Sequence, residues 1–339
     1  MVNKKIFFTL IISILLTSLS FAQIPSPLKD VKVSAAVTFD ATTGIYTYSY
    51  SIYNPPVNDG KIRNLRIDIT RPQQSQELSS KGFIIQRGIK ADGSMLIRSF
   101  EEEIAKRLMR KPVIPVGARP PLGHPFPGWS AGIAVMGTIS WGGSDENLIL
   151  PNQTVGGFIL TSYGLPGIRE ATNDPVIDYD NLPEEYWENV ELTRQLRESL
   201  IYRTKTIGPT APPADFKPIP FLDYIISLKH EAYKLGWIVQ GRDDDKSKKE
   251  DEEKGIMKSL DKKLEKAKAE LVKGDTREAI EKLKSFIHEV EALYKEDKEE
   301  KHKKEEEHSH ITSEAYALLK YNTRYLIEKL GGEKKEKDH

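Results

Sequence analysis

Three histidines near the C-terminus come closest to a metal site in residue type and spacing. His302, His308 and His310 lie close together among several glutamates. Imidazole nitrogens bind zinc and nickel, and glutamate oxygens can complete the coordination shell. The same run, residues 295–310, is dense in charges of both signs, which favours a solvated loop or a helix extension. Weak surface binding of zinc or nickel is one interpretation, and no resident cofactor is expected.

General acid–base chemistry has one candidate histidine. His124 stands in a Pro- and Gly-rich stretch, with no nucleophile beside it in the sequence. The chain lacks the H-E-x-x-H and phosphate-loop motifs. It has no Cys, which excludes a thiol nucleophile, a disulfide framework and Cys-ligated zinc. The sequence leaves enzymatic activity open and favours a non-catalytic role.

Aromatic side chains could stack on sugar rings. Tyr46, Tyr48 and Tyr50 share one face of an expected strand, in phase with Ile52. That phase predicts a place in the core, with hydroxyl groups reaching the edge of the sheet. The other candidate ligand-binding residues are Trp129, Trp141 and His124. Exposed rings in a groove would favour carbohydrate binding, and buried rings would favour a non-catalytic binding module.

The secondary structure expected to position these residues is mainly strand in the first half of the chain and mainly helix in the second half. Residues 31–70 alternate between apolar and polar with the period of half-buried strands, and residues 129–167 form a second β-rich stretch. Strands with one apolar face need a second layer, so we predict an antiparallel, immunoglobulin-like β-sandwich over residues 23–170. Between the two blocks, 3.6-residue spacing predicts a helix over 94–110, and the Pro/Gly-rich residues 112–128 predict a loop without regular structure.

Short motifs in this half carry a resemblance. They are Tyr46–Asn54, the run from Leu150 to Phe158, and Ser162–Gly167. Together they resemble β-sandwich modules of exported bacterial proteins of unassigned function, although Asn152 stands where that pattern has Gly. The resemblance implies a structural module and no active site.

Helical periodicity governs the rest of the chain. Residues 171–217 are expected to form a connector, in which Glu184–Leu200 could be one helix and Gly208–Pro213 is a Pro-rich linker without a strand. Four apolar stripes then predict a helical bundle over 218–332, able to fold on its own, with charged insertions at 241–255 and 295–310. Residues 333–339 form a charged tail. The fold class is thus α+β and multidomain.

The turn between two of these helices carries a second resemblance. Leu264, Ala267, Leu271, Gly274 and Asp275 begin a pattern that continues through Ala279, Leu283, Phe286, Ile287 and Val290. This pattern resembles the FIMAH type of helical module, found at the C-terminal end of secreted bacterial proteins and hydrolases. The resemblance implies an appended non-catalytic module, from which the charged insertion after Leu293 departs.

The N-terminus predicts the destination of the chain. Residues 1–22 combine Lys4 and Lys5, an apolar run and Ser20-Phe-Ala22, which fits a secretory signal peptide cleaved before Gln23. An uncleaved membrane anchor is the alternative. We expect a secreted or periplasmic protein with no integral membrane segment after processing, and the zero net charge of the chain argues against a nucleic-acid partner.

Two functional hypotheses follow. The first is a non-catalytic, exported module that binds an envelope or extracellular protein or glycan. The second is a secreted carbohydrate-active enzyme or a carbohydrate-binding accessory subunit. The burial of Trp129, Trp141 and the tyrosines is the structural feature that distinguishes them.

Overall fold

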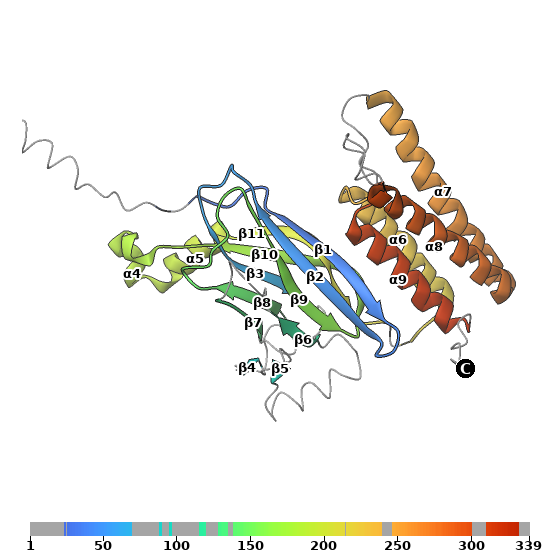
Figure 1. Cartoon of the computed structure of the whole chain (residues 1–339), viewed down its shortest axis with the longest axis horizontal. Coiled ribbons are helices and arrows are strands. Elements are labelled where there is room, and N and C mark those ends of the chain that lie inside the picture. The colour runs from blue at the N-terminus through green and yellow to red at the C-terminus, as the bar shows by residue number, and fades with distance from the viewer. Residues whose placement is uncertain are drawn as a thin grey trace, which may run out of the picture.

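Antiparallel sheets form the first part of the chain, and helices that pack together form the second (Figure 1). The computed structural model describes residue 24 and residues 26–69, 88–89, 95–96, 115–119, 128–134, 138–213, 215–238, 246–299 and 310–331. The α+β class predicted from the sequence is therefore confirmed.

Four strands make the first sheet, in the order β1-β2-β9-β6. Their bounds are β1 Lys32–Asp40, β2 Ile45–Asn54, β9 Gln153–Ser162 and β6 Pro115–Arg119. Buried and exposed residues alternate along β1 and β2 as the period-2 pattern predicts. The prediction that residues 112–128 lack regular structure was wrong at β6, because a Pro-containing segment can still pair along an edge.

Five strands make the second sheet, in the order β11-β10-β3-β8-β7. Their bounds are β11 Tyr202–Thr210, β10 Leu165–Pro175, β3 Ile62–Asp68, β8 Thr138–Gly143 and β7 Trp129–Ala134. A separate pair of two-residue strands is formed by β4 Gly88–Ile89 and β5 Met95–Leu96. The helix predicted over 94–110 is contradicted at β5, and its other residues lie outside the described ones.

The connector prediction was also wrong at both of its ends. The β10 strand runs on to Pro175, and β11 returns to pair with β10 through Gly208–Thr210, where the sequence analysis expects a linker without a strand. Extended proline-containing backbone can join a sheet at its edge, and β11 is the edge strand here. The sheets thus use residues on both sides of the proposed boundary at 170.

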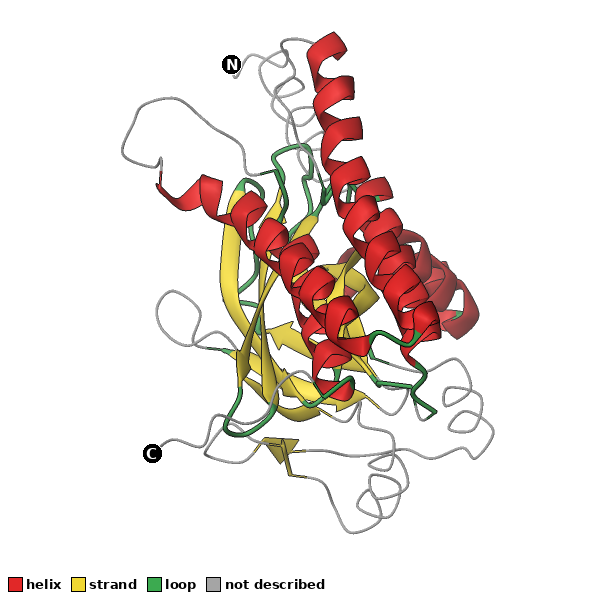
Figure 2. Ribbon diagram, turned by 90° about the vertical axis from the view of Figure 1, so that its right-hand side faces the viewer, coloured by secondary structure: helices red, strands yellow, loops and turns green. Residues whose placement is uncertain are grey.

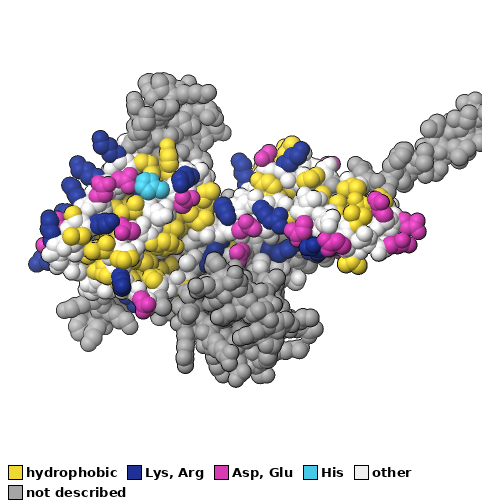
Figure 3. All heavy atoms as spheres, turned by 180° about the vertical axis from the view of Figure 1, so that it is seen from behind, with side chains coloured by type: hydrophobic (Ala, Val, Ile, Leu, Met, Phe, Trp, Pro, Cys, Tyr) yellow, Lys and Arg dark blue, Asp and Glu magenta, His cyan; other side chains and the backbone are white. Residues whose placement is uncertain are grey.

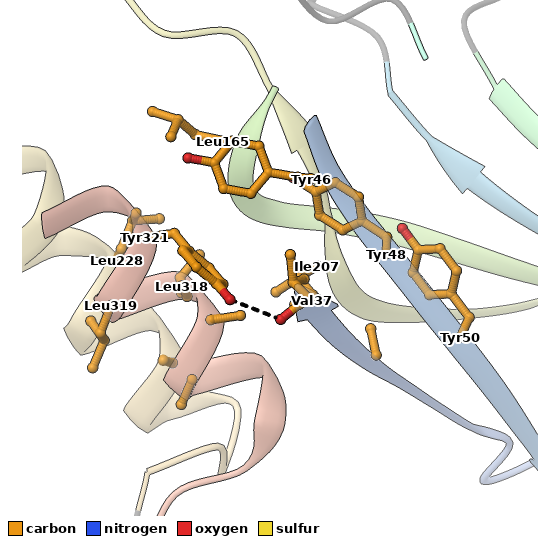
Figure 4. Close-up of a cluster of buried hydrophobic side chains, with 14 of the residues drawn as sticks. Val37, Tyr46, Tyr48, Tyr50, Leu165, Ile207, Leu228, Leu318, Leu319 and Tyr321 are labelled. Carbon is orange, nitrogen blue, oxygen red and sulfur yellow. Dashed lines mark hydrogen bonds between the residues drawn. The ribbon is translucent and has the colours of Figure 1, made fainter. Parts of the chain in front are cut away.

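Large aromatic rings fill the space between the two sheets. The ring centroids of Tyr50 on β2 and Trp141 on β8 are 5.7 Å apart, and those of Trp141 and Phe158 on β9 are 6.0 Å apart. Tyr46, Tyr48 and Tyr50 are buried, so their assignment to the core is confirmed. Figure 4 shows these three tyrosines in a row along β2.

We predict that replacing Tyr50 with Phe leaves the free energy of unfolding unchanged or raises it. Among the described residues, the buried Tyr50 hydroxyl has no hydrogen-bond partner, so the change removes a desolvated polar group. In the matched variant Tyr48→Phe, the hydroxyl that donates to the Gly164 carbonyl at 2.8 Å is lost, and we expect a cost of about 1–2 kcal/mol. Urea denaturation measures both; equal costs would contradict the assignment.

Burial also makes stability depend on alkaline pH. It raises the pKa of the Tyr46, Tyr48 and Tyr50 phenols above their ordinary value, because the charged phenolate is poorly solvated in the core. A raised folded-state pKa leaves stability intact below the unfolded value of about 10 and lowers it as pH rises beyond that value. Tyr50→Phe should weaken this loss in alkaline denaturation curves.

Four long helices complete the chain. Their bounds are α6 Pro218–Lys234, α7 Lys246–Lys273, α8 Thr276–Glu299 and α9 Ser313–Lys329. Gly274, with φ of +83°, ends α7, and the Asp275 side chain accepts from the Glu278 backbone N–H at 3.0 Å to begin α8. The first charged insertion, placed at 241–255, is helical from Lys246 onward and belongs to α7. The second continues α8 as far as Glu299.

The last helix, α9, joins the helices to both sheets. Figure 2 shows the helices lying over one side of the sheets, and Figure 4 shows Tyr321 of α9 directed at β1. The Tyr321 hydroxyl donates to the Val37 carbonyl at 3.1 Å, and the Asn322 amide donates to the Pro166 carbonyl of β10 at 2.8 Å. One buried apolar cluster therefore runs through the sheets and the helices.

Candidate binding surface

A helical segment interrupts the connection between two paired strands. Asn173 of β10 pairs with Tyr202 of β11, yet residues 176–201 leave the sheet between them. We call residues 176–201 the excursion. It contains the short helices η1 Tyr179–Asn181, α4 Glu184–Glu188 and α5 Val190–Leu200. Figure 1 places α4 and α5 at the end of the sheets opposite α6–α9. Connections between neighbouring antiparallel strands usually need only about 2–5 residues, so the excursion is a substantial insertion.

The excursion has a small core of its own. Leu182, Leu196 and Leu200 are buried together, and Ile177 and Tyr186 pack against them. The Asn189 side chain accepts from the Leu192 backbone N–H at 3.0 Å and thereby begins α5. This cap divides the single helix expected over 184–200 into α4 and α5. The excursion is accordingly an ordered unit.

A buried carboxylate fixes the excursion to the sheet. Asp174, at the end of β10, pairs with Arg66 of β3 and with Arg197 of α5 at 3.2 Å. The Asn64 amide donates to the same carboxylate oxygen at 3.2 Å. All three contacts are to Oδ2, and the buried Oδ1 has no hydrogen-bond partner among the described residues. The Arg197 contact thus connects α5 to the sheet carboxylate that also pairs with β3.

Apolar side chains are exposed on the outer side of this unit. Trp187 is 57 % exposed, Val190 82 % and Tyr179 44 %. All three line a pocket of about 240 Å³, together with Leu182, Tyr186 and Thr193. The Trp187 indole N–H donates to the Leu182 carbonyl at 3.3 Å, which restrains the ring. Binding to a restrained side chain loses less conformational entropy.

Acidic residues flank the pocket-lining residues in the sequence, and we call these acidic residues the rim. Residues 178–191 contain Asp178, Asp180, Glu184, Glu185, Glu188 and Glu191, and no Lys or Arg. All six side chains are exposed. Seen from behind in Figure 3, acidic and hydrophobic side chains share the surface at this end of the molecule. The Glu191 pKa is lowered to about 2 by hydrogen bonds from Arg194 and Gln195. Among the described residues, none forms an ion pair with Glu184, Glu185 or Glu188.

The binding and metal candidates from the sequence lie elsewhere or outside the described residues. Trp129 is 5 % exposed and Trp141 is fully buried, so neither offers a ring face to a ligand. His124, His302 and His308 lie outside the described residues, and His310 is half-buried. Within the part of the chain that the structure describes, no three His, Cys, Asp or Glu side chains are grouped to hold a metal ion.

One sequence motif needs its structural context. Gly128-Trp-Ser-Ala-Gly132 has the G-x-S-x-G spacing of a hydrolase nucleophile, so the expectation that this pattern is absent from the chain was wrong. That chemistry needs a serine on a sharp turn between a strand and a helix. Ser130 instead lies within β7, paired with Gly142 of β8. The spacing is therefore a coincidence of the strand sequence.

A second pocket lies where the sheets meet the helices. It has a volume of about 280 Å³ and is lined mainly by apolar side chains, among them Leu165, Pro212, Phe221 and Tyr224. Asp215 and Lys217 are its charged lining residues. This composition resembles an imperfectly filled joint between layers more than a catalytic site.

Sequence reasoning assigned the excursion to a connector and named no binding residue in it. The available signal was Trp187 beside Val190, two apolar residues that do not fit the buried stripe of Leu196 and Leu200. No described helix is long and apolar enough to cross a membrane. No protein-family model matches the chain, and no curated protein matches it.

Proposed function

We propose that this chain is an exported, non-catalytic binding protein that uses the excursion as its contact surface. In this proposal the signal peptide directs it to the periplasm or the medium. The sheets form an immunoglobulin-like sandwich that presents the excursion, and α6–α9 complete the fold. One observation carries the proposal: Trp187 and Val190 are exposed around a pocket on an ordered unit that pairs with Asp174 of the sheet through Arg197.

The arrangement supports binding for energetic reasons. Tryptophan and tyrosine side chains supply much of the binding energy at protein interfaces, especially when a pocket and a polar rim surround them. The excursion has these features within a single ordered segment. The aromatic rings of the sheets, by contrast, are used in the core. The burial of Trp129 and Trp141 supports the binding-module hypothesis over the carbohydrate-active one.

Site-specific photo-crosslinking tests this function. A photoreactive amino acid replaces Val190 in one version of the full chain and Val272, on α7, in the other. Val272 is a matched control because it is 68 % exposed and lies on a helix away from the excursion. In native host cells we expect a discrete crosslinked product from position 190 that is absent from position 272. Identical product patterns at the two positions would contradict the proposal.

Carbohydrate binding is the second candidate, and one observation favours it. Trp187 and Tyr179 both expose ring surface in the same pocket, and such rings can stack on sugars. In this case a purified oligosaccharide would bind the full chain, and Trp187→Ala would abolish that binding. The photo-crosslinking experiment would then give no protein partner at position 190.

A further inference from the structure

We infer that the partner of the excursion is a protein segment that carries lysine or arginine residues around one apolar side chain. This inference rests on the proposed function and specifies the chemistry of its partner. The pocket offers apolar walls and the rim offers carboxylates. A complementary segment would place an apolar side chain between Trp187 and Val190 and its cations at the rim.

The charge of the rim determines the sign of the partner. Glu184, Glu185 and Glu188 are exposed on α4, on both sides of Trp187 in the sequence. Within the described residues they have no cationic partner, so their negative potential is available to a ligand. Complementary charge accelerates association and discriminates against partners of the same sign. A cationic segment gains from this field, whereas an acidic one is repelled.

The aromatic rings reinforce the same choice. Lysine and arginine side chains bind the faces of tryptophan and tyrosine through the ring quadrupole, most strongly for tryptophan. Trp187 and Tyr179 both line the pocket and are exposed, and each is adjacent in the sequence to a carboxylate of the rim. A neutral sugar would also stack on a ring, but would leave the charge of the rim uncompensated. The observations therefore favour a basic peptide over a glycan.

A charge-matched pair of peptides tests the inference on the full mature chain. The probe is fluorescein-labelled Lys-Lys-Gly-Phe-Gly-Lys-Lys, and its partner has Glu in place of every Lys. Fluorescence anisotropy should detect binding of the lysine peptide only, and this binding should weaken as salt is raised. Equal binding of the glutamate peptide, or binding of cellotetraose with no binding of the lysine peptide, would overturn the inference.

Matched variants locate the binding. The triple variant E184Q/E185Q/E188Q should bind the lysine peptide roughly tenfold more weakly or worse. The control E265Q/E281Q/E328Q removes three exposed carboxylates from the long helices and should leave binding unchanged. Equal losses in the two triple variants would overturn the inference by showing a response to overall charge alone.

Variants of Trp187 separate the two proposals. Trp187→Ala should lose the lysine peptide, and Trp187→Phe, which keeps a ring face, should retain part of the binding. Unaltered binding in Trp187→Ala would place the peptide elsewhere and overturn the inference. If the peptide fails to bind but position 190 still crosslinks to a discrete protein, the cationic partner is wrong and the proposed function stands. If the crosslink is also missing, the proposed function fails.

Discussion

A chain that ends before α9 should lose the fold of the sheets as well as that of the helices. Buried apolar side chains cover most of this helix, among them Leu318, Leu319, Leu326 and Ile327. Each such side chain contributes about 1.5–3 kcal/mol through burial. Their sum is comparable to the free energy of unfolding of a whole protein, about 5–15 kcal/mol.

The polar contacts of α9 explain why the sheets depend on it. The β1 strand is the edge of its sheet, and its outer backbone groups need partners. The Glu314 carboxylate accepts from the Ala35 N–H at 2.6 Å, and the Ser313 hydroxyl donates to the Ala35 carbonyl at 2.8 Å. Tyr321 bonds the Val37 carbonyl in the same way. The side chains of α9 thus bind the edge of β1 in place of a further strand.

Near-ultraviolet circular dichroism reports on the aromatic core of the sheets and measures the effect of the deletion. A chain that ends after residue 309 should lack a cooperative transition in that signal. A chain that ends after Gly331 keeps α9 and should melt as the full chain does. Retention of a cooperative sheet transition without α9 would contradict the shared core.

A point variant gives the same information without truncation. Leu318→Ala should lower the free energy of unfolding by about 2–5 kcal/mol. Far- and near-ultraviolet signals should shift together, because Leu318 belongs to the core that the sheets and helices share. Two separated transitions would restore the view that residues 218–332 fold alone, as the sequence alone indicates.

Hydrophobic periodicity predicted most of the individual strands and helices, but it did not predict how the helices pack against the sheets. The alternation from Val31 onward and the 3.6-residue stripe around Leu283 identify β1, β2 and α8, because each reflects one buried face. In α9, however, Ala317 and Tyr321 are buried in addition to the stripe of Leu318 and Leu326. A helix that is buried on two sides contacts a second layer of the structure. The apolar stripe alone does not predict which elements form that layer.

The edge strands and the exposed residues of the excursion were not predicted from the sequence, for different reasons. The β11 strand alternates Tyr202, Thr204 and Thr206 with Arg203 and Lys205, a strand pattern that its proline and the neighbouring linker obscure. Trp187 lies off the stripe of Leu196 and Leu200, but whether it is exposed depends on which face of the excursion the small core buries. Trp129 and Trp141 attracted attention by residue type, but strand phase places them inside.

The second large effect concerns a buried ion pair between two helices. Lys229 of α6 is completely buried, and its ammonium group pairs with the Asp261 carboxylate of α7, which is 29 % exposed. His230 Nε2 lies 3.7 Å from the same carboxylate oxygen. The two partners differ in their access to water, because the Asp261 carboxylate is partly solvated and the Lys229 ammonium group is not. Removing one partner from such a pair typically costs about 3–5 kcal/mol when a buried charge remains.

We therefore expect Asp261→Ala to be far more destabilising than Lys229→Met. Asp261→Ala leaves the ammonium group of Lys229 buried and unpaired, and should cost about 3–5 kcal/mol. Lys229→Met replaces the cation with an apolar side chain of similar length and leaves Asp261 partly in water, so its cost should be small. The double variant should resemble Lys229→Met, because it contains no buried charge. Urea denaturation of the three variants measures this asymmetry. Equal costs for the two single variants would show that Lys229 reaches water when its partner is removed.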